Sequence, residues 1–249
     1  FNDFYRAAEC VRAISQSHLY PANTRLLDAG EALINGAGDG KQSILVLNFE
    51  SADRPQESNL QRALEIVRDH GGEYDDAADK ADGAQRRGAA GQWRDSFLRM
   101  PYYREVLTPR GIIADTFETS ITWDRFPGFH AKVITETERA IEDVTGTRGV
   151  VTCRFTHVYP DGPAPYFSFH ALGDKQRLVE QCWAIKIAAS DVLNSLGGTI
   201  THHHAVGRDH RRWYDRQRPG LFADALRAAK KTLDPRGMLN PGVLIDPLA

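Results

Sequence analysis

The sequence has no long hydrophobic run, and none of its apolar stretches approaches the ~20 residues that a membrane-spanning helix needs. It also lacks an excess of charge of either sign. The formal net charge is −2, which argues against a global field for nucleic acid or for a membrane surface. Hydrophobic content of 41% and charged content of 26% are ordinary for a soluble globular protein, which is therefore the class we expect.

Cysteine is scarce and its positions follow no metal-binding spacing. The three cysteines, Cys10, Cys153 and Cys182, are an odd count without a CxxC pair. This argues against a disulfide framework or a structural zinc site and favours a reducing, cytoplasmic compartment. The chain also begins without an initiator Met or a signal peptide, directly in an amphipathic pattern. We therefore expect a piece of a longer protein.

A nucleotide-binding fingerprint is missing as well. Gly36, Gly38 and Gly40 lie close together, but they lack the GxGxxG spacing and no strand leads from them into a helix. We predict a flexible loop there. Residues 75–92 are rich in Asp, Ala, Gly and Arg with little that can pack, and we predict a mobile stretch.

The elements that are present follow a regular order from Gly111 onward. Hydrophobic periodicity predicts strands over residues 112–123, 149–159, 166–171 and 199–204, with helices over 124–145 and 174–196. This β-α-β-β-α-β order is typical of a ferredoxin-like α+β fold, an antiparallel sheet flanked by helices. A strand over 43–49 and the helix after Pro55 suggest a second, less complete repeat, and a helix over 221–232 lies near the end of the chain.

Three consecutive histidines, His202, His203 and His204, follow the Gly197-Gly198 pair. On a strand, alternate side chains point to opposite faces, so His202 and His204 would share a face that His203 does not. Imidazoles titrate near neutral pH and suit proton transfer or anion binding. A polar, exposed strand end is the plainer alternative. We predict no metal site, because a contiguous triplet places its rings poorly around one ion.

Tyr166 begins a strand whose polar face also carries Ser168 and His170, whereas its phenylalanines face the core. A tyrosine there can donate or accept a proton if a nearby cation lowers its pKa, or it can simply cap the sheet edge. Arg154, on the preceding strand, is placed to share this polar face. Arg104 follows two tyrosines, and its guanidinium is suited to a carboxylate or a phosphate, or to a structural salt bridge.

Arginines are concentrated between Arg208 and Arg218, but Asp209 and Asp215 interrupt them. Because of these acids and the neutral overall charge, we predict no nucleic-acid binding. A solvated surface is the default for this segment, and a contact to a phosphate is the alternative.

Four blocks of the sequence together resemble one enzyme family, the alkyldihydroxyacetonephosphate synthases, which are flavoenzymes of ether-lipid synthesis. The histidine triplet in its Gly-Gly-Thr-Ile-Thr-His-His-His setting resembles that family's His-His-His segment. The other three blocks are Pro21-Ala22-Asn23-Thr24-Arg25-Leu26, Asp115-Thr116-Phe117-Glu118-Thr119-Ser120, and Thr152-Cys153-Arg154-Phe155-Thr156 followed by Tyr166. The wider group is the FAD-linked oxidases of the vanillyl-alcohol-oxidase type, and the chain corresponds to their C-terminal or cap region.

The resemblance implies a role for each matching residue. Tyr166 would be the proton donor and acceptor, and the three histidines would be imidazoles required near the flavin. Arg104, Arg25 and Arg154 would bind the substrate. We assign no residue of this chain to the cofactor with certainty, because the FAD-binding half would lie upstream.

The implied reaction exchanges the acyl group of acyl-dihydroxyacetone phosphate for a fatty alcohol through a flavin adduct, without net redox change. Residues 1–205 would form the substrate or cap domain, and residues 206–249 a helical segment returning toward the FAD-binding domain. A lipid phosphate and a fatty alcohol would be the ligands, and a peripheral membrane contact and a homodimer are compatible with this interpretation.

Two departures from the family pattern keep other interpretations open. Ala205 stands where glycine usually follows the triplet, and Arg208 where lysine is usual. The tail from Leu233 to Gly242 is closer to that of flavin-linked 2-hydroxy-acid dehydrogenases, although those usually carry Glu-His-Gly where this chain has His-His-Ala. The alternatives are therefore an FAD-linked dehydrogenase or oxidase of a hydroxy acid or alcohol, and a non-catalytic ferredoxin-like binding module.

Overall fold

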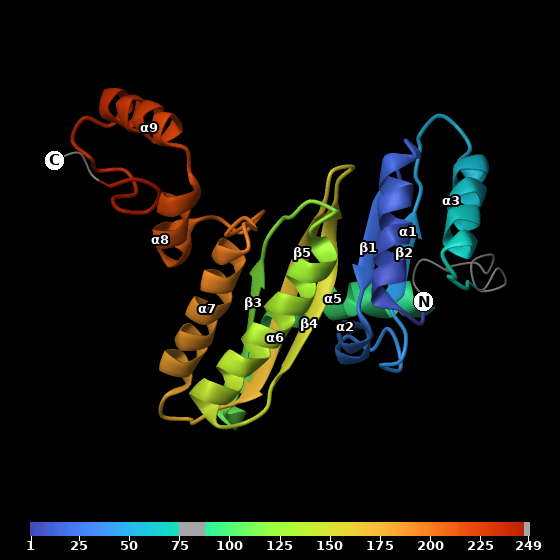
Figure 1. Ribbon diagram of the computed structural model, residues 1–249, viewed down its shortest axis with the longest axis horizontal. Helices are drawn as coiled ribbons and strands as arrows, with labels where there is room; N and C mark the ends of the chain where they lie inside the picture. Colours follow the sequence, from blue (N-terminus) through green and yellow to red (C-terminus); the bar gives the residue numbers. More distant parts are fainter. Residues whose placement is uncertain (75–87, 247–249) are drawn as a thin grey trace.

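A computed structural model describes residues 1–74 and 88–246 (Figure 1). Its strands are β1 (Asn23–Leu27), β2 (Ile44–Asn48), β3 (Ile112–Glu118), β4 (Val150–Val158) and β5 (Pro163–Leu172). Its helices are α1 (Phe4–Gln16), α2 (Ala29–Ile34), α3 (Glu57–Asp69), α5 (Gly88–Leu107), η2 (Thr108–Arg110), α6 (Phe126–Thr145), α7 (Leu178–Ser195), α8 (Gly207–Gln217) and α9 (Gly220–Leu233). None of the helices in these two ranges combines the length and the hydropathy needed to cross a membrane.

The strands form one antiparallel sheet in the order β2-β1-β4-β5-β3. The segment β3-α6-β4-β5-α7 supplies the ferredoxin-like part and matches the first five elements of the predicted β-α-β-β-α-β order. The N-terminal strands β1 and β2 extend the same sheet, because Leu26 and Leu27 of β1 pair with Phe155 and Arg154 of β4. The α+β fold and the antiparallel sheet are therefore confirmed.

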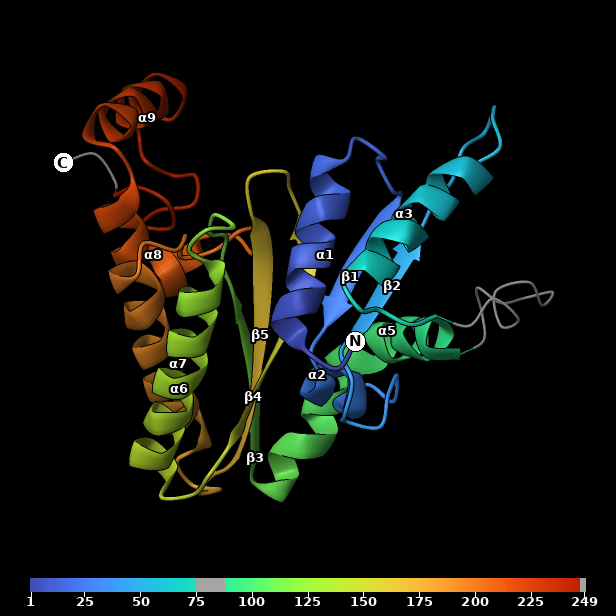
Figure 2. The same ribbon diagram turned by 45° about the vertical axis from the view of Figure 1, so that its right-hand side comes forward.

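One face of the sheet carries the main hydrophobic core. Leu26, Phe155 and Phe167 lie on this face, and they pack against apolar side chains of α1, α6 and α7. Successive residues of a strand point to opposite faces. Leu27, next to Leu26, accordingly packs with Ala32 and Trp93 in a separate small cluster beneath α2 and α5. Figure 2 shows α6 and α7 on one side of β3, β4 and β5, with α2 and α5 on the other.

The second face is polar where it passes over β3, β4 and β5. It carries Arg154 on β4 and Tyr166 and Ser168 on β5, because these residues alternate with the core residues Phe155, Phe167 and Phe169. The side chains of Arg154, Tyr166 and Ser168 are buried. This polar face is where the candidate functional residues gather.

Beyond the sheet, α8 and α9 continue from the end of α7 (Figure 1). The indole Nε1 of Trp213 on α8 donates a hydrogen bond of 2.7 Å to Asp191 on α7. In α9, Ala223 is buried, whereas Leu221 and Leu233 are exposed. The helix predicted over 221–232 is confirmed; the division between residues 1–205 and 206–249 stays a prediction.

The strand predicted over residues 199–204 is wrong. This segment is irregular, and so His202 and His204 do not share a strand face. The chain leaves α7 through Gly197, whose φ of +73° a residue with a side chain rarely adopts. It then lies against the residues that follow β3, where Thr199 N donates to Ser120 O over 3.2 Å and Thr119 Oγ1 donates to Thr199 O over 2.6 Å. The carboxylate of Glu118, and not a neighbouring strand, accepts the backbone N–H groups of His202, His203 and His204.

Three smaller predictions differ from the structure. Helix α7 begins at Leu178, four residues later than the helix predicted over 174–196. The mobile stretch predicted over 75–92 lies partly outside the described residues, and its last five positions belong to α5. Strand β3 ends at Glu118, several residues earlier than expected.

Candidate functional site

Glu118 organises the segment that holds the histidine triplet. It is the last residue of β3, and its side chain is 1% exposed. Its Oε1 accepts the backbone N–H groups of three consecutive residues: His202 at 2.9 Å, His203 at 2.5 Å, and His204. Consecutive N–H groups that converge in this way form an anion-binding concavity. The triplet is therefore wrapped around a carboxylate supplied by the chain itself.

These bonds affect the acidity of the carboxyl group. Burial raises the pKa of Glu118, but the N–H bonds from His204 and His202 and the nearby rings of His204 and His203 outweigh it, so the pKa lies below its usual range. Glu118 is accordingly a carboxylate at neutral pH. Its Oε2 pairs with Nδ1 of His203.

The imidazole rings form a cluster with a fourth histidine from β4. The ring of His157 lies 5.0 Å from that of His202 and 5.1 Å from that of His203, measured between centroids. His202 Nε2 is hydrogen-bonded to the hydroxyl of Tyr159 over 2.9 Å. Burial, followed by the neighbouring rings of His202 and His203, lowers the pKa of His157, and burial likewise lowers that of His204. Both rings are therefore neutral at pH 7.

Tyr166 lies directly beside this cluster. Its cross-strand partner on β3 is Glu118. Its ring is stacked on that of His203, with 6.1 Å between the centroids and 22° between the planes. It meets the ring of His204 edge-on, with 5.2 Å between the centroids. Its hydroxyl donates to Oγ1 of Thr116 over 2.9 Å. Burial raises the pKa of Tyr166, although the Thr116 bond and the charge of Arg154 partly oppose this. The phenol is therefore protonated at neutral pH.

Arg154 supports Tyr166 from the neighbouring strand, as the shared polar face predicts. The two residues are paired across β4 and β5, and the guanidinium carbon lies 4.0 Å from the centre of the phenol ring. The Arg154 side chain is only 3% exposed and forms an ion pair with Glu31 of α2. Glu31 Oε2 also accepts a bond of 2.6 Å from Thr152 Oγ1. Arg154 is thus a buried, paired cation, and the structure does not present it as a free ligand for a substrate.

Arg25 lies on β1, which pairs with β4, so it belongs to the same sheet as Arg154. Burial, followed by the charge of Arg154, lowers the pKa of Arg25. The two guanidinium groups therefore add positive charge to one region of the polar face.

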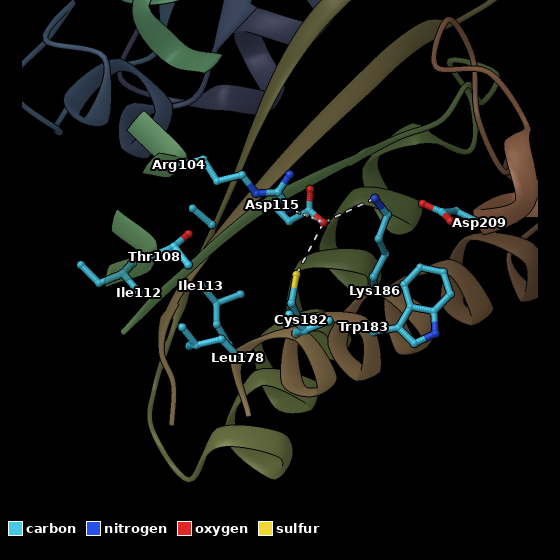
Figure 3. A pocket seen from close by; sticks show the side chains of 12 residues that line it. Arg104, Thr108, Ile112, Ile113, Asp115, Leu178, Cys182, Trp183, Lys186 and Asp209 are labelled. Carbon is cyan, nitrogen blue, oxygen red and sulfur yellow. Dashed lines mark hydrogen bonds and ion pairs between the residues drawn. The ribbon is translucent and has the colours of Figure 1, made fainter. Parts of the chain in front are cut away.

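Arg104 lies elsewhere, at a pocket of about 310 Å³ along the outer edge of β3. Its guanidinium is 3.6 Å from Oδ2 of Asp115, and its side chain is 62% exposed. Figure 3 shows Asp115 between Lys186 and Cys182, both of α7 and both 3.5 Å from the same carboxylate oxygen. The structure therefore groups Arg104 with a second charged site, separate from the histidine cluster.

Two residues that carry the site were not selected from the sequence. Glu118 stands within the block 115–120, but nothing local distinguishes it from an exposed strand-end glutamate. Glu31 belongs to a short helix that Asp28 caps through a bond to Glu31 N. A buried charge needs an opposite charge beside it. The buried position of Arg154 on its strand was therefore the available signal that an acid such as Glu31 would pair with it.

The cluster has the donor set that a flavin ring requires. The ring offers an aromatic plane with carbonyl and ring-nitrogen acceptors. The polar face offers phenol, imidazole and guanidinium groups, and His202 Nδ1, His170 Nδ1 and Arg154 Nε are buried without a hydrogen-bond partner among the described residues. His157, His202 and His203 also each offer one ring nitrogen, and these three nitrogens lie within 4.8 Å of one another, close enough to hold a metal ion. The residues fit an aromatic, acceptor-rich cofactor.

Comparison with known proteins agrees with this geometry. Residues 1–244 match the family described as FAD linked oxidases, C-terminal domain. The chain is 33% identical over 149 residues to alkyldihydroxyacetonephosphate synthase of Caenorhabditis elegans, covering 58% of this chain and 25% of the relative. It is 31% identical over 105 residues to glycolate oxidase subunit GlcD of Bacillus subtilis, covering 42% of this chain and 22% of the relative.

A solved structure of alkyldihydroxyacetonephosphate synthase superposes with a TM-score of 0.70 at 17% identity, covering 97% of this chain and 43% of that one. At this identity the likeness shows the fold alone. The chain thus spans about a quarter of the length of the two curated relatives and less than half of the solved protein.

The buried Tyr166 and Arg154 of the sheet, the partly exposed imidazoles beside them and the family match over residues 1–244 together indicate a domain of a flavin-dependent enzyme. The chain belongs to the FAD linked oxidase C-terminal domain family. The family resemblance seen in the sequence and the expectation of FAD as the cofactor are both confirmed.

Proposed function

We propose that this chain is the substrate-binding and catalytic region of an FAD-dependent enzyme of the alkyldihydroxyacetonephosphate synthase type. Such an enzyme exchanges the acyl group of acyl-dihydroxyacetone phosphate for a fatty alcohol. The observation that most supports the proposal is the contact of Tyr166 with the rings of His203 and His204 on the polar sheet face. A synthase from Caenorhabditis elegans is also among the relatives of the chain.

In this proposal Tyr166 gives and receives a proton at its hydroxyl oxygen. The raised pKa keeps the phenol protonated at rest, so donation is its first action. Thr116 Oγ1 holds the hydroxyl in place, and Arg154 fixes the ring from its face. The imidazoles of His202, His203 and His204 supply the remaining acid–base and hydrogen-bonding groups. FAD, when bound, would supply the electron-accepting ring at which the acyl and alkyl groups are exchanged.

The arginines divide into two kinds in the same proposal. Arg104 is exposed and beside a pocket, so it binds the anionic part of the substrate. Arg25, on the polar face, contributes positive charge near the reacting groups. Arg154 acts through Tyr166, because its side chain is buried and paired with Glu31.

The remaining features of the whole protein are proposals of the same kind. A segment upstream of this chain holds most of the FAD, and residues 206–249 return toward it. The substrates are a lipid phosphate and a fatty alcohol, delivered by a peripheral membrane contact. The enzyme is a cytoplasmic homodimer that binds no nucleic acid.

Replacing the phenol tests the proposed role of Tyr166. In the full-length enzyme, Tyr166→Phe should abolish turnover while leaving flavin binding intact, because only one hydroxyl is removed. Tyr5→Phe is the matched control, since it removes a hydroxyl bonded to His130 at 3.0 Å, outside the cluster. A Tyr166→Phe enzyme with bound flavin and unchanged activity would refute the assignment.

A second function is favoured by the relationship to GlcD and by the tail of the chain. GlcD is the relative with 31% identity, and the tail from Leu233 to Gly242 resembles that of 2-hydroxy-acid dehydrogenases. An FAD-linked dehydrogenase of a hydroxy acid or alcohol would pass electrons to an added acceptor when substrate is supplied. The synthase would not.

A further inference from the structure

We propose that Glu118 is the positioning residue of the histidine cluster. It holds His203 with a proton on Nδ1, so that the free Nε2 of this one imidazole is the proton acceptor of the reaction. The inference deepens the proposed function and rests on its assumption that the cluster performs acid–base chemistry. It applies to the synthase and to the dehydrogenase alike, because both must remove a proton from their substrate.

The two oxygens of Glu118 have different partners. Oε1 accepts the N–H groups of His202, His203 and His204, and in addition the hydroxyl of Thr201 over 3.1 Å. Oε2 is buried, has no hydrogen-bond partner of ordinary geometry among the described residues, and makes its closest ion-pair contact with Nδ1 of His203. One oxygen thus shapes the backbone of the triplet, and the other is directed at a single ring.

This pairing fixes the tautomer of His203. A carboxylate accepts hydrogen bonds and cannot donate them, so the Nδ1 that faces it carries the proton. In the neutral ring Nε2 then has a free lone pair. The side chain of His203 is 41% exposed, and within residues 1–74 and 88–246 its Nε2 takes part in no hydrogen bond.

The other imidazoles of the cluster are less suited to accept a proton. His202 Nε2 is occupied by the hydroxyl of Tyr159, and its Nδ1 is buried. Burial lowers the pKa of both His157 and His204, which makes their protonated forms unfavourable. Within the described residues, His203 is the member of the triplet whose ring forms an ion-pair contact with a carboxylate, so Glu118 orients this ring and holds its tautomer.

Tyr166 cannot fill this role at rest, because its pKa is raised and its hydroxyl donates to Thr116. The two stacked side chains therefore complement each other, one as a proton donor and the other as an acceptor. In the step assigned to His203, a bond between hydrogen and the substrate breaks heterolytically. The electron pair stays on the substrate, an N–H bond forms at Nε2, and a later step returns the proton. No electrons are transferred to the protein.

Glu118→Gln in the full-length, flavin-loaded enzyme tests the inference. The amide oxygen can still accept the three backbone N–H groups, so the loop keeps its support. The amide NH₂ now faces Nδ1 of His203 and donates to it, which forces the ring proton onto Nε2. We expect kcat to fall by about 100-fold or more, as expected when a catalytic imidazole is held in the wrong tautomer, whereas KM changes little.

Glu65→Gln is the matched control, because it makes the same acid-to-amide change at an exposed position of α3, where the carboxylate pairs with Arg62. Its kcat should stay close to that of the wild type. Activity is measured with whichever substrate the enzyme turns over, so failure of the synthase assay does not affect the comparison.

A ¹⁵N NMR measurement of the histidine-labelled full-length enzyme gives a readout independent of turnover. The wild type should show His203 protonated at Nδ1 in its neutral form, and Glu118→Gln should show it protonated at Nε2. A wild-type ring with its proton on Nε2 would overturn the inference, even if the variant failed to fold. So would a Glu118→Gln enzyme with the switched tautomer and wild-type kcat.

Discussion

The guanidinium carbon of Arg154 lies 4.0 Å from the ring centre of Tyr166, its direct partner across strands β4 and β5. This contact joins the proposed reacting phenol to a buried ion pair, because Arg154 also binds Glu31. Cation–π contacts of a desolvated guanidinium contribute about 2 kcal/mol. The position of Tyr166 therefore depends on a carboxylate that lies on α2, far from it in the sequence.

Breaking this pair should destabilise the protein strongly. Arg154→Met leaves the Glu31 carboxylate buried without its cation, and we expect a loss of about 3–5 kcal/mol in the free energy of unfolding. The double variant Glu31→Gln, Arg154→Met should lose less than the sum of the two single variants. Urea denaturation measures the free energy of unfolding of the two single variants and the double variant. The exposed pair Arg62–Glu65 is the control, and breaking it should cost less than about 1 kcal/mol. Additive losses at Glu31 and Arg154 would contradict the proposed pairing.

His130 should make the fold sensitive to acid. It is buried among aromatic rings, and burial lowers its pKa to about 4. The folded pKa lies below the unfolded value, so this contribution to stability is complete above pH ~6.5 and is lost as the pH falls toward 4. The full loss is about 3 kcal/mol.

His130→Phe removes this titration while keeping an aromatic ring next to Phe4 and Phe126. The free energy of unfolding of the variant should fall less between pH 6.5 and 4 than that of the wild type. Unfolding curves at several pH values provide the measurement, with a substitution of the exposed His18 as the control. Equal pH slopes for wild type and His130→Phe would show that His130 is not held neutral.

Gly162 should tolerate no side chain. It lies in the β4–β5 turn, and an added Cβ would be 2.0 Å from the backbone oxygen of Ile121. Because the atoms that this Cβ would meet belong to the backbone, the turn must shift, and we expect Gly162→Ala to cost about 1–3 kcal/mol. Gly128 in α6 is the matched control, since an added Cβ there meets nothing within 4 Å. Gly128→Ala should stabilise by about 0.5–1 kcal/mol; thermal unfolding separates these opposite signs.

Arg104 should affect substrate binding more than the chemical step. Its guanidinium is exposed beside the pocket and separate from the histidine cluster. Arg104→Met should therefore raise KM about 10-fold. This is the effect of losing roughly 1.5 kcal/mol from a charged hydrogen bond to the substrate. The value of kcat should change much less. Steady-state kinetics of the full-length enzyme provides the test, with Arg110→Met as a control on the neighbouring η2. A large fall in kcat with unchanged KM would place Arg104 among the reacting groups instead.

The sequence was sufficient to predict strands β3, β4 and β5 and one side of the site. Alternation of phenylalanine with polar residues placed Tyr166 and Arg154 on one face, because a strand's period of two is a local property. The same reasoning failed for His202 to His204. Thr199-Ile200-Thr201 has a local preference for strand. The backbone of His202 to His204 is instead held by Glu118, which lies 84 to 86 residues earlier in the sequence. Glu31 escaped prediction for the same reason, since its partner Arg154 is 123 residues distant.

The whole-protein activity is tested most directly by one incubation. Full-length enzyme is mixed with acyl-dihydroxyacetone phosphate, a fatty alcohol and an artificial electron acceptor, and both ether product and reduced acceptor are measured. Tyr166→Phe serves as the parallel inactive enzyme. The account predicts ether product from the wild type alone and no reduction of the acceptor. Acceptor reduction without any ether product would contradict it.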